Sequence, residues 1–292
     1  MSKRSFDNAT GRLQRPDGAA LAWECVRPDG RPAVLFAHGF GQTRQAWQGS
    51  ARTLAAHGCR CVSFDTRGHG QSGRTPDGAY AMQQFVDDLA AMAAAQPAPP
   101  VLVGASMGGL LGLVLAGEAQ PAPFRALVLV DITPRWESAG NERVLAFMRA
   151  HPDGFADLDH AAQAVAAYLP QRRERKTAAQ LEPLLRRGDD GRLHWHWDPA
   201  MLDTVGAAAA SYQPRLLAAA RRIDVPVLLL SGGRSDMVSA ATIDEFLQLV
   251  PHARHVRLPD ATHMLAGDAN DAFTREVARF VDDLPQPAGV QP

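Results

Sequence analysis

Four short apolar runs alternate with longer helix-like stretches in the first half of the chain. Each run has the length of a β-strand and is apolar almost throughout, which is typical of a strand whose two faces are both covered. The runs are 33–39, 59–65, 100–106 and 124–131. The stretches between them, 43–57, 81–96 and 107–120, fit helices. This alternation predicts a mostly parallel sheet with right-handed crossovers.

Strand-like patterns also occur before and after this segment. Residues 12–26 contain two such stretches around the turn sequence Pro16-Asp17-Gly18 and predict an antiparallel hairpin at the edge of the sheet. Late in the chain, strand patterns at 225–233 and 253–259 are followed by helical stretches at 240–250 and 269–284. The predicted fold class is therefore α/β, with a mostly parallel eight-stranded sheet flanked by helices.

The alternation of strands and helices breaks between residues 134 and 222. This segment shows amphipathic pieces separated by proline and glycine, and no strong strand pattern. We interpret it as a helical cap inserted between the sixth and seventh strands. The predicted domains are a core formed by residues 1–133 and 223–292, and a cap formed by residues 134–222.

Composition limits the possible partners and location. The chain has 292 residues, of which 46% are hydrophobic, and its 30 basic and 31 acidic residues nearly cancel. A soluble globular protein has this composition, and nucleic acid is not an expected partner because the excess positive charge of such binders is missing. The chain shows neither a signal-peptide pattern nor an apolar run long enough to span a membrane, so we predict a cytoplasmic protein without a membrane partner.

The sharpest chemical signal is Gly104-x-Ser106-x-Gly108, which follows a predicted strand directly and precedes a predicted helix. In this strand–turn–helix setting, a strained turn raises the serine hydroxyl above the sheet, and the glycines keep side chains out of the close helix–strand contact. We predict that Ser106 is a nucleophile. A serine hydroxyl needs a histidine to accept its proton and a carboxylate to orient that histidine.

His263 is the predicted base, because it lies after the last strand, at the sheet edge where sites of open parallel sheets form. Two aspartates compete as its partner. Asp236 follows the strand 225–233 in a glycine-rich loop, and Asp131 ends the strand 124–131. We favour Asp236, since its loop can turn back toward His263 and Asp236 precedes His263 by one strand–helix–strand unit. Asp131 is then a structural or pocket-edge residue.

Acyl transfer also requires donors for the negatively charged oxygen of the tetrahedral intermediate. The backbone N–H of Met107, directly after Ser106 and at a helix start, is one predicted donor. The second is the N–H of Phe40, in the His38-Gly39-Phe40-Gly41 loop after the strand 33–39.

These segments together resemble the α/β-hydrolase superfamily, in the branch of capped bacterial serine esterases with haloperoxidase-like, lactonase and C–C hydrolase relatives. The resemblance lies in HGFG at 38–41, DTRGHGQS at 65–72, GASMGG at 104–109, and the late Asp236 and His263. It implies the predicted fold and cap, a structural loop at 65–70, and no metal or other cofactor. Haloalkane dehalogenases and epoxide hydrolases of this fold carry an aspartate where this chain has Ser106, so those reactions are disfavoured.

We predict substrate-pocket residues at the loops and in the cap. They are His38, Trp47, Met107, Phe147, Trp195, Trp197 and Met264, and the side chain of Phe40 is also free to line the pocket. His194 and His196 form an H-x-H pair, but the sequence places no third metal ligand nearby. Alternation along 194–197 places Trp195 and Trp197 on the same side, against core or pocket.

The function hypothesis is a serine hydrolase that cleaves carboxylic esters of small, mostly apolar substrates through a Ser-His-Asp triad and an acyl-enzyme. The motifs leave two alternatives open. One is C–C bond hydrolysis of a ring-cleavage product, or lactone opening, on the same triad. The other is a non-catalytic ligand-binding protein of this fold. The expected partner is the small-molecule ester, and the protein is expected to be a monomer or homodimer.

Overall fold

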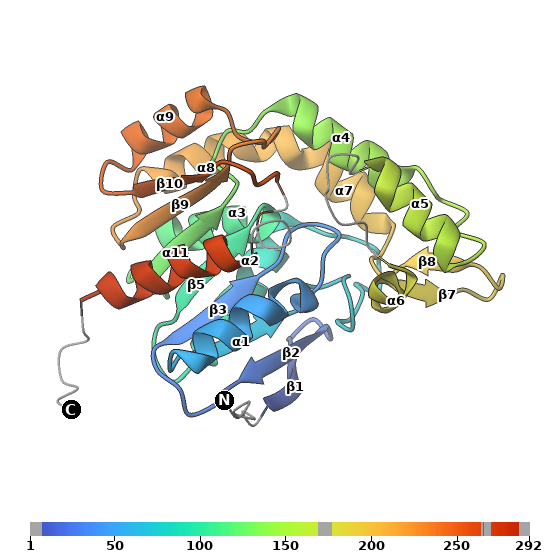
Figure 1. Cartoon of the computed structure of the whole chain (residues 1–292), viewed down its shortest axis with the longest axis horizontal. Helices are drawn as coiled ribbons and strands as arrows, with labels where there is room; N and C mark the ends of the chain where they lie inside the picture. The colour runs from blue at the N-terminus through green and yellow to red at the C-terminus, as the bar shows by residue number, and fades with distance from the viewer. Residues whose placement is uncertain (1–7, 169–176, 264, 266–269, 286–292) are drawn as a thin grey trace.

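The computed structural model describes residues 8–168, 177–263, 265 and 270–285, with the side chains of residues 8, 205–210 and 270 left undescribed. Its centre is an eight-stranded sheet in the order β1-β2-β4-β3-β5-β6-β9-β10 (Figure 1). The strands are β1 (Asn8–Gln14), β2 (Ala20–Val26), β3 (Ala33–Ala37), β4 (Arg60–Phe64), β5 (Val101–Ala105), β6 (Ala126–Val130), β9 (Val227–Gly232) and β10 (Arg254–Leu258). β1 and β2 form the predicted antiparallel hairpin at one edge, β2 pairs antiparallel with β4, and the remaining pairs are parallel. This arrangement confirms the predicted fold class.

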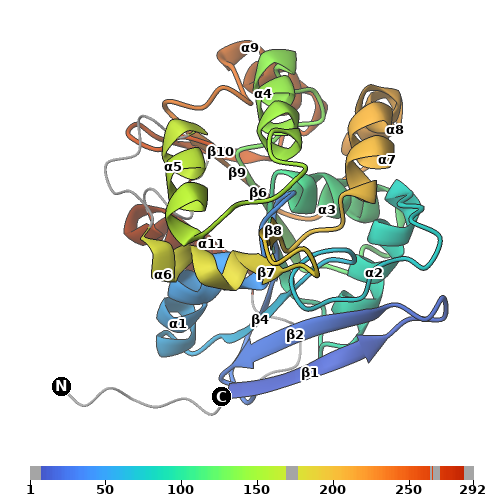
Figure 2. The ribbon, with the colours of Figure 1, turned by 90° about the vertical axis from the view of Figure 1, so that its right-hand side faces the viewer.

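Helices cover both faces of the sheet, which explains why its strands are apolar on both sides. Figure 2 shows α1 and α11 on one side and α2, α3 and α8 on the other. The helices are α1 (Gln48–Ala56), α2 (Met82–Ala94), α3 (Met107–Glu118), α8 (Gln213–Ala220), α9 (Ala240–Leu249) and α11 (Asn270–Asp283). Successive strand residues alternate between the two apolar clusters: Leu35 joins the cluster beside α2 and α3, whereas Val34 and Phe36 join the one beside α1 and α11.

The segment between β6 and β9, called the insertion below, is mainly helical. It contains α4 (Ser138–Arg149), α5 (Leu158–Tyr168), α6 (Ala178–Leu181) and α7 (Ala200–Ala208) before α8. A short antiparallel pair, β7 (Leu185–Arg187) and β8 (Leu193–Trp195), also lies in this segment, where the sequence shows no strong strand pattern. Figure 1 shows α4, α5 and α7 forming an arch that extends from the sheet to β7 and β8.

The last helix of the insertion, α8, packs directly against the core helix α3. A Cβ atom added at Gly117 of α3 would collide with the backbone carbonyl of Ala219 in α8. Leu216 and Ala219 of α8 are fully buried. This part of the segment 134–222 therefore helps to cover the sheet. The division of the chain into core and cap domains stays a prediction.

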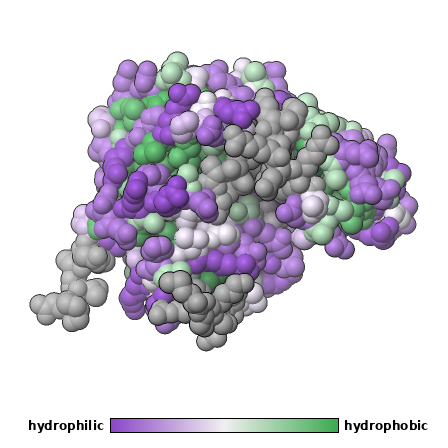
Figure 3. All heavy atoms as spheres, in the orientation of Figure 1, coloured by the Kyte–Doolittle hydropathy of each residue, from purple (hydrophilic) through white to green (hydrophobic). Residues whose placement is uncertain are grey.

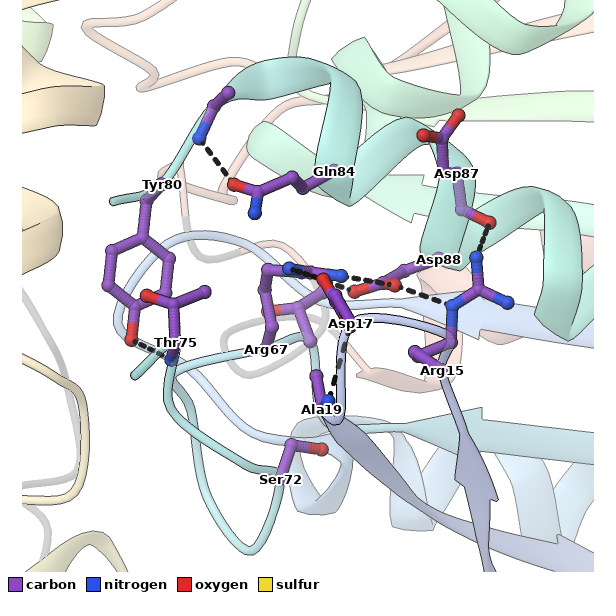
Figure 4. A network of polar contacts seen from close by, with 12 residues as sticks. Arg15, Asp17, Ala19, Arg67, Ser72, Thr75, Tyr80, Gln84, Asp87 and Asp88 are labelled. Carbon is purple, nitrogen blue, oxygen red and sulfur yellow. Dashed lines mark hydrogen bonds and ion pairs between the residues drawn. The ribbon is translucent and has the colours of Figure 1, made fainter. Parts of the chain in front are cut away.

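A buried arginine anchors the loop that follows β4. Figure 4 shows the Arg67 guanidinium between Asp88 of α2 and Asp17 of the β1–β2 turn, with Arg15 of the adjoining segment also bound to Asp88. The Arg67 Nε–Asp88 Oδ2 and Arg67 Nη1–Asp17 Oδ2 distances are both 2.7 Å. Because Arg67 and Asp88 are both buried, each charge is stabilised by its partner instead of by water. The network ties the loop 65–73 to α2 and to the edge hairpin.

In the face drawn in Figure 3, hydrophilic residues predominate and are interrupted by smaller hydrophobic areas. No helix in the described part of the chain is both long and apolar enough to span a membrane. Cys25, Cys59 and Cys61 are buried free thiols, and burial raises the pKa of each of them.

Candidate active site

Ser106 occupies a strained turn between β5 and α3. Its backbone has φ +47° and ψ −117°, a conformation that costs energy for any residue with a side chain. Two glycines permit the turn: a Cβ atom at Gly104 would lie 2.6 Å from the Gly108 carbonyl oxygen, and one at Gly108 would collide with the backbone of Ala37. The predicted serine elbow is therefore present, with Ser106 at the carboxyl end of a central strand.

Asp131 is the carboxylate that binds His263. The His263 Nδ1–H donates to Asp131 Oδ2 over 2.7 Å. Asp131 follows β6, is completely buried, and has φ +51°. Its other partners are the N–H of Gly232, 2.7 Å from Oδ1, and the hydroxyl of Ser235. Because these donors satisfy the carboxylate and fix its direction, His263 is held with Nδ1 protonated and Nε2 free to accept a proton.

The preference for Asp236 as the partner of His263 is wrong. Asp236 turns away toward the insertion, where its carboxylate pairs with Arg143 of α4 over 2.6 Å, and 39% of its side chain is exposed. The neighbouring Ser235, not Asp236, returns to the centre of the site and donates to Asp131.

Glycines in the loop after β9 allow His263 to reach β6. A Cβ atom at Gly232 would lie 2.6 Å from the carbonyl oxygen of Ala261. One at Gly233 would lie 2.6 Å from Pro259 Cα. The chain before His263 therefore passes close over the end of β9, so that the imidazole meets Asp131 on the next strand.

Met107 and the loop that carries Phe40 both adjoin Ser106. Met107 is the first residue of α3, so its N–H has no acceptor within the helix. Phe40 lies in a turn closed by the Gln42 N–H to Gly39 carbonyl bond of 3.1 Å, and a Cβ atom at Gly39 would lie 3.2 Å from Ser106 Cβ. No acceptor among the described residues receives the N–H of Phe40. The oxyanion roles of both groups stay predictions.

An apolar cavity opens beside Ser106. Phe40, Met107 and Ser106 itself line it, together with residues from α2, α3, α4, α8 and the loops near them. The other lining residues are Met82, Phe85, Leu110, Leu111, Ile132, Trp136, Asn141, Val144, Leu145, Tyr212, Leu216 and Met237. Within the described part of the chain, no residue that lines this cavity carries a charge.

Of the described residues predicted for the pocket, Phe40 and Met107 line this cavity and the others do not. Trp47 is buried in the core, with its ring 5.2 Å from Phe36 and 5.9 Å from Phe273. Phe147 stacks on Tyr168 at 4.1 Å within the insertion. Trp195 and Trp197 stack on each other at 4.8 Å, which confirms that they share a side, but neither lines the cavity. His38 is fully buried and its ring is hydrogen-bonded to the backbone of Gly39 and Thr66, and Met264 lies outside the described residues.

The cavity residues on α4 have a spacing that could be recognised in the sequence. Asn141, Val144 and Leu145 recur at i, i+3 and i+4, one face of an amphipathic helix. Tyr212 and Leu216 are likewise four residues apart. The spacing indicates that each set shares a face, but it does not say which neighbour that face contacts.

Three buried histidines connect the loops around Ser106. They are His38, His69 and His196, and each uses one ring nitrogen as acceptor for a backbone N–H and the other as donor to a carbonyl. Burial lowers the pKa of all three, that of His69 well below 6.5 and that of His196 to about 4. They are therefore neutral near pH 7, as their hydrogen bonds require.

His194 and His196 do not converge. His194 Nε2 bonds to Asp190 over 2.9 Å at the end of the β7–β8 hairpin, whereas His196 points into the core. The residues described contain no cluster of three or more His, Cys, Asp or Glu side chains suited to hold a metal ion.

Stability is expected to fall as the pH is lowered from 6.5 to 5. In this range the unfolded chain binds protons on His38, His69 and His196 that the folded protein excludes, because their folded pKa values are lowered. Each such histidine contributes a slope of up to about 1.4 kcal/mol per pH unit. Urea unfolding at pH 7, 6 and 5 measures the effect. The His196→Gln protein should take up about one proton fewer on unfolding, and its stability should depend correspondingly less on pH. Equal stability at pH 7 and 5 would contradict the neutral assignment.

Comparison with known proteins places the chain in a family. A model described as the alpha/beta hydrolase fold matches residues 32–269, so the chain belongs to the α/β-hydrolase family, as its motifs predict. The chain is 30% identical over 247 residues to a 3-hydroxybutyrate-oligomer hydrolase of Cupriavidus necator, covering 80% of this chain and 83% of that protein. It is 27% identical over 256 residues to a 2-(acetamidomethylene)succinate hydrolase of Mesorhizobium japonicum, covering 86% and 88%.

A solved structure agrees in fold. The crystal structure of an E-2-(acetamidomethylene)succinate hydrolase superposes with a TM-score of 0.80 at 23% identity, covering 94% of this chain and all of that one. Several relatives of the chain are hydrolases, among them an esterase and an enol-lactonase.

Proposed function

We propose that the protein is a serine hydrolase of carboxylic esters in which Ser106 is the nucleophile, His263 the base and Asp131 the carboxylate that orients it. The observation that carries this proposal is the Asp131–His263 hydrogen bond of 2.7 Å at the same sheet edge as the strained Ser106 turn. The presence of a nucleophile, an oriented base and two candidate oxyanion donors favours an enzyme over a ligand-binding protein.

The proposed reaction has two halves. Ser106 Oγ attacks the ester carbonyl while His263 Nε2 takes the hydroxyl proton, and the N–H groups of Phe40 and Met107 stabilise the oxyanion. Collapse of this intermediate breaks the bond to the alcohol, which leaves with the proton from His263. Water, deprotonated by the same imidazole, then attacks the acyl-enzyme, and Ser106 recovers its proton as the acid departs.

The cavity supports an uncharged, mostly apolar substrate. Its walls are Phe, Met, Leu, Ile, Val and Trp side chains, with Ser106, Asn141 and Tyr212 as the polar exceptions. A carboxylate bound among these residues would lose its hydration without gaining a cationic partner, which costs several kcal/mol. A panel of esters that differ only in charge tests this property.

We expect p-nitrophenyl pentanoate to be hydrolysed with a kcat/KM at least about 10-fold above that of the p-nitrophenyl half-ester of glutaric acid. The two acyl chains have equal length and differ in the terminal carboxylate. Initial rates of nitrophenol release at pH 7.5 provide the measurement. A preference for the charged ester would overturn the proposed substrate class. Faster cleavage of a vinylogous 1,5-diketone or an enol lactone than of any ester in the panel would favour the C–C hydrolase or lactonase alternative instead.

A further inference from the structure

Two imidazole rings from distant parts of the chain hold the oxyanion loop, residues 38–42, at Gly41. The Gly41 N–H donates to His69 Nε2 over 3.0 Å, and the Gly41 carbonyl accepts from His196 Nε2–H over 3.2 Å. Gly41 has φ +74°, and a glycine has few steric limits on its backbone angles. The two hydrogen bonds therefore fix the residue next to Phe40 at the point where the loop has most freedom.

His196 comes from the insertion, one residue beyond β8, and is almost completely buried. Its Nδ1 accepts the N–H of Gly70 over 2.9 Å, so the same ring also contacts the loop that follows β4. The ring packs edge-on against Trp197 at 5.4 Å and lies 6.0 Å from the ring of His69. One side chain of the insertion thus connects two loops of the core.

His69 cannot replace the bond from His196. Its Nε2 is already the acceptor for the Gly41 N–H, and its Nδ1 lies 3.1 Å from the Arg67 carbonyl and 2.9 Å from Thr66 Oγ1. The ring of Phe40 packs edge-on against His69 at 5.6 Å, which links the side chain of the proposed oxyanion residue to the same cluster. Without His196, the Gly41 carbonyl would lose the donor that sets the direction of the peptide after it.

We infer that His196 is a positioning residue for the oxyanion hole, which holds the Phe40 N–H in place by donating to the Gly41 carbonyl. The inference rests on the proposed ester hydrolysis. Oxyanion stabilisation depends on donors set in advance at about 3 Å from the reacting oxygen, and a shift of about 1 Å can cost up to about 100-fold in rate. The insertion would then set the rate of the chemical step as well as the shape of the pocket.

Two substitutions distinguish the roles of the two ring nitrogens of His196. In His196→Asn, the amide oxygen can take the place of Nδ1 and accept from Gly70, but no donor reaches Gly41. In His196→Gln, the longer side chain can place an amide N–H near the position of Nε2 and donate to Gly41. We expect kcat for p-nitrophenyl butyrate to fall about 10- to 100-fold in His196→Asn and to recover most of this loss in His196→Gln. KM should change less than about 2-fold, because acylation and deacylation both pass through an oxyanion and slow together.

The control is Phe155→Leu, a change at a fully buried residue of the insertion that packs on Trp195 and His151. It should lower the melting temperature and leave kcat within about 2-fold of wild type. If His196→Asn does not fold, His196→Met takes its place, since it fills similar space without a donor and must also lose kcat at constant KM.

The outcomes distinguish this inference from the proposed function. These outcomes are interpreted once the wild type hydrolyses the ester and Ser106→Ala does not. Wild-type kcat in His196→Asn or His196→Met would then overturn the positioning role. Equal losses of kcat in His196→Asn and His196→Gln would overturn it as well. A wild-type protein without ester hydrolysis would overturn the proposed function and the inference together.

Discussion

Replacement of Asp131 by Asn is expected to lower kcat by about 10⁴-fold, with little change in KM. Asp131 Oδ2 accepts the His263 Nδ1–H, and Oδ1 accepts the Gly232 N–H. An asparagine that keeps the bond to Gly232 presents its NH₂ group to His263, which favours the tautomer protonated on Nε2. That tautomer cannot accept the proton of Ser106. Steady-state hydrolysis of p-nitrophenyl butyrate measures the loss.

Asp236→Asn is the matched control for this prediction. Its carboxylate is partly exposed and paired with Arg143, so the change removes a surface ion pair worth less than about 1 kcal/mol. We expect kcat within about 3-fold of wild type, since nothing in the Asp131–His263 pair is altered. A loss in Asp236→Asn that equals or exceeds that in Asp131→Asn would return the carboxylate role to Asp236.

Ser106→Ala is expected to lower kcat/KM by about 10⁵- to 10⁶-fold, because the proposed reaction has no other nucleophile. The free energy of unfolding should change by less than about 0.5 kcal/mol, since the substitution removes one hydroxyl and leaves the strained turn as it is. Ester hydrolysis and urea unfolding on the same preparation measure both quantities. Activity within 100-fold of wild type in a folded Ser106→Ala protein would exclude Ser106 as the nucleophile.

The strands could be predicted from the sequence because burial of both faces of a strand requires apolar residues along its whole length. Runs such as 33–39 and 100–106 are apolar almost throughout, and in the structure β3 and β5 lie within these runs with helices on both faces. The serine elbow could also be predicted from the sequence, since only glycines fit where Gly104 and Gly108 contact neighbouring backbone. In both cases, local sequence and tertiary contact impose the same requirement.

The partner of His263 could not be chosen in this way. Asp131 and Asp236 both follow strands whose carboxyl ends lie at one sheet edge, and chain order suits either aspartate. The choice depends on the close passage of residues 259–261 over Gly232 and Gly233, which directs His263 to Asp131. This passage is a contact between segments that are distant in the chain, and the sequence of neither loop indicates it.

Most of the residues that line the cavity were missed for a related reason. Helix α4 is amphipathic in sequence, but its orientation relative to Ser106 depends on how the insertion folds over the sheet. Val144 and Leu145 line the cavity, whereas the larger Phe147 packs on Tyr168 and Trp195. An aromatic side chain in the insertion was therefore a poor guide to the pocket.

Labelling with a fluorophosphonate tests most directly whether Ser106 is an activated nucleophile. The reagent phosphonylates a serine hydroxyl with loss of fluoride, and it requires a base and oxyanion donors, the roles proposed for His263, Phe40 and Met107. Mass spectrometry of the digested protein is predicted to find one label per wild-type chain, on the peptide that contains Ser106, and none on Ser106→Ala. An unlabelled wild-type protein, or a label on another residue, would contradict the role of Ser106 as the activated nucleophile.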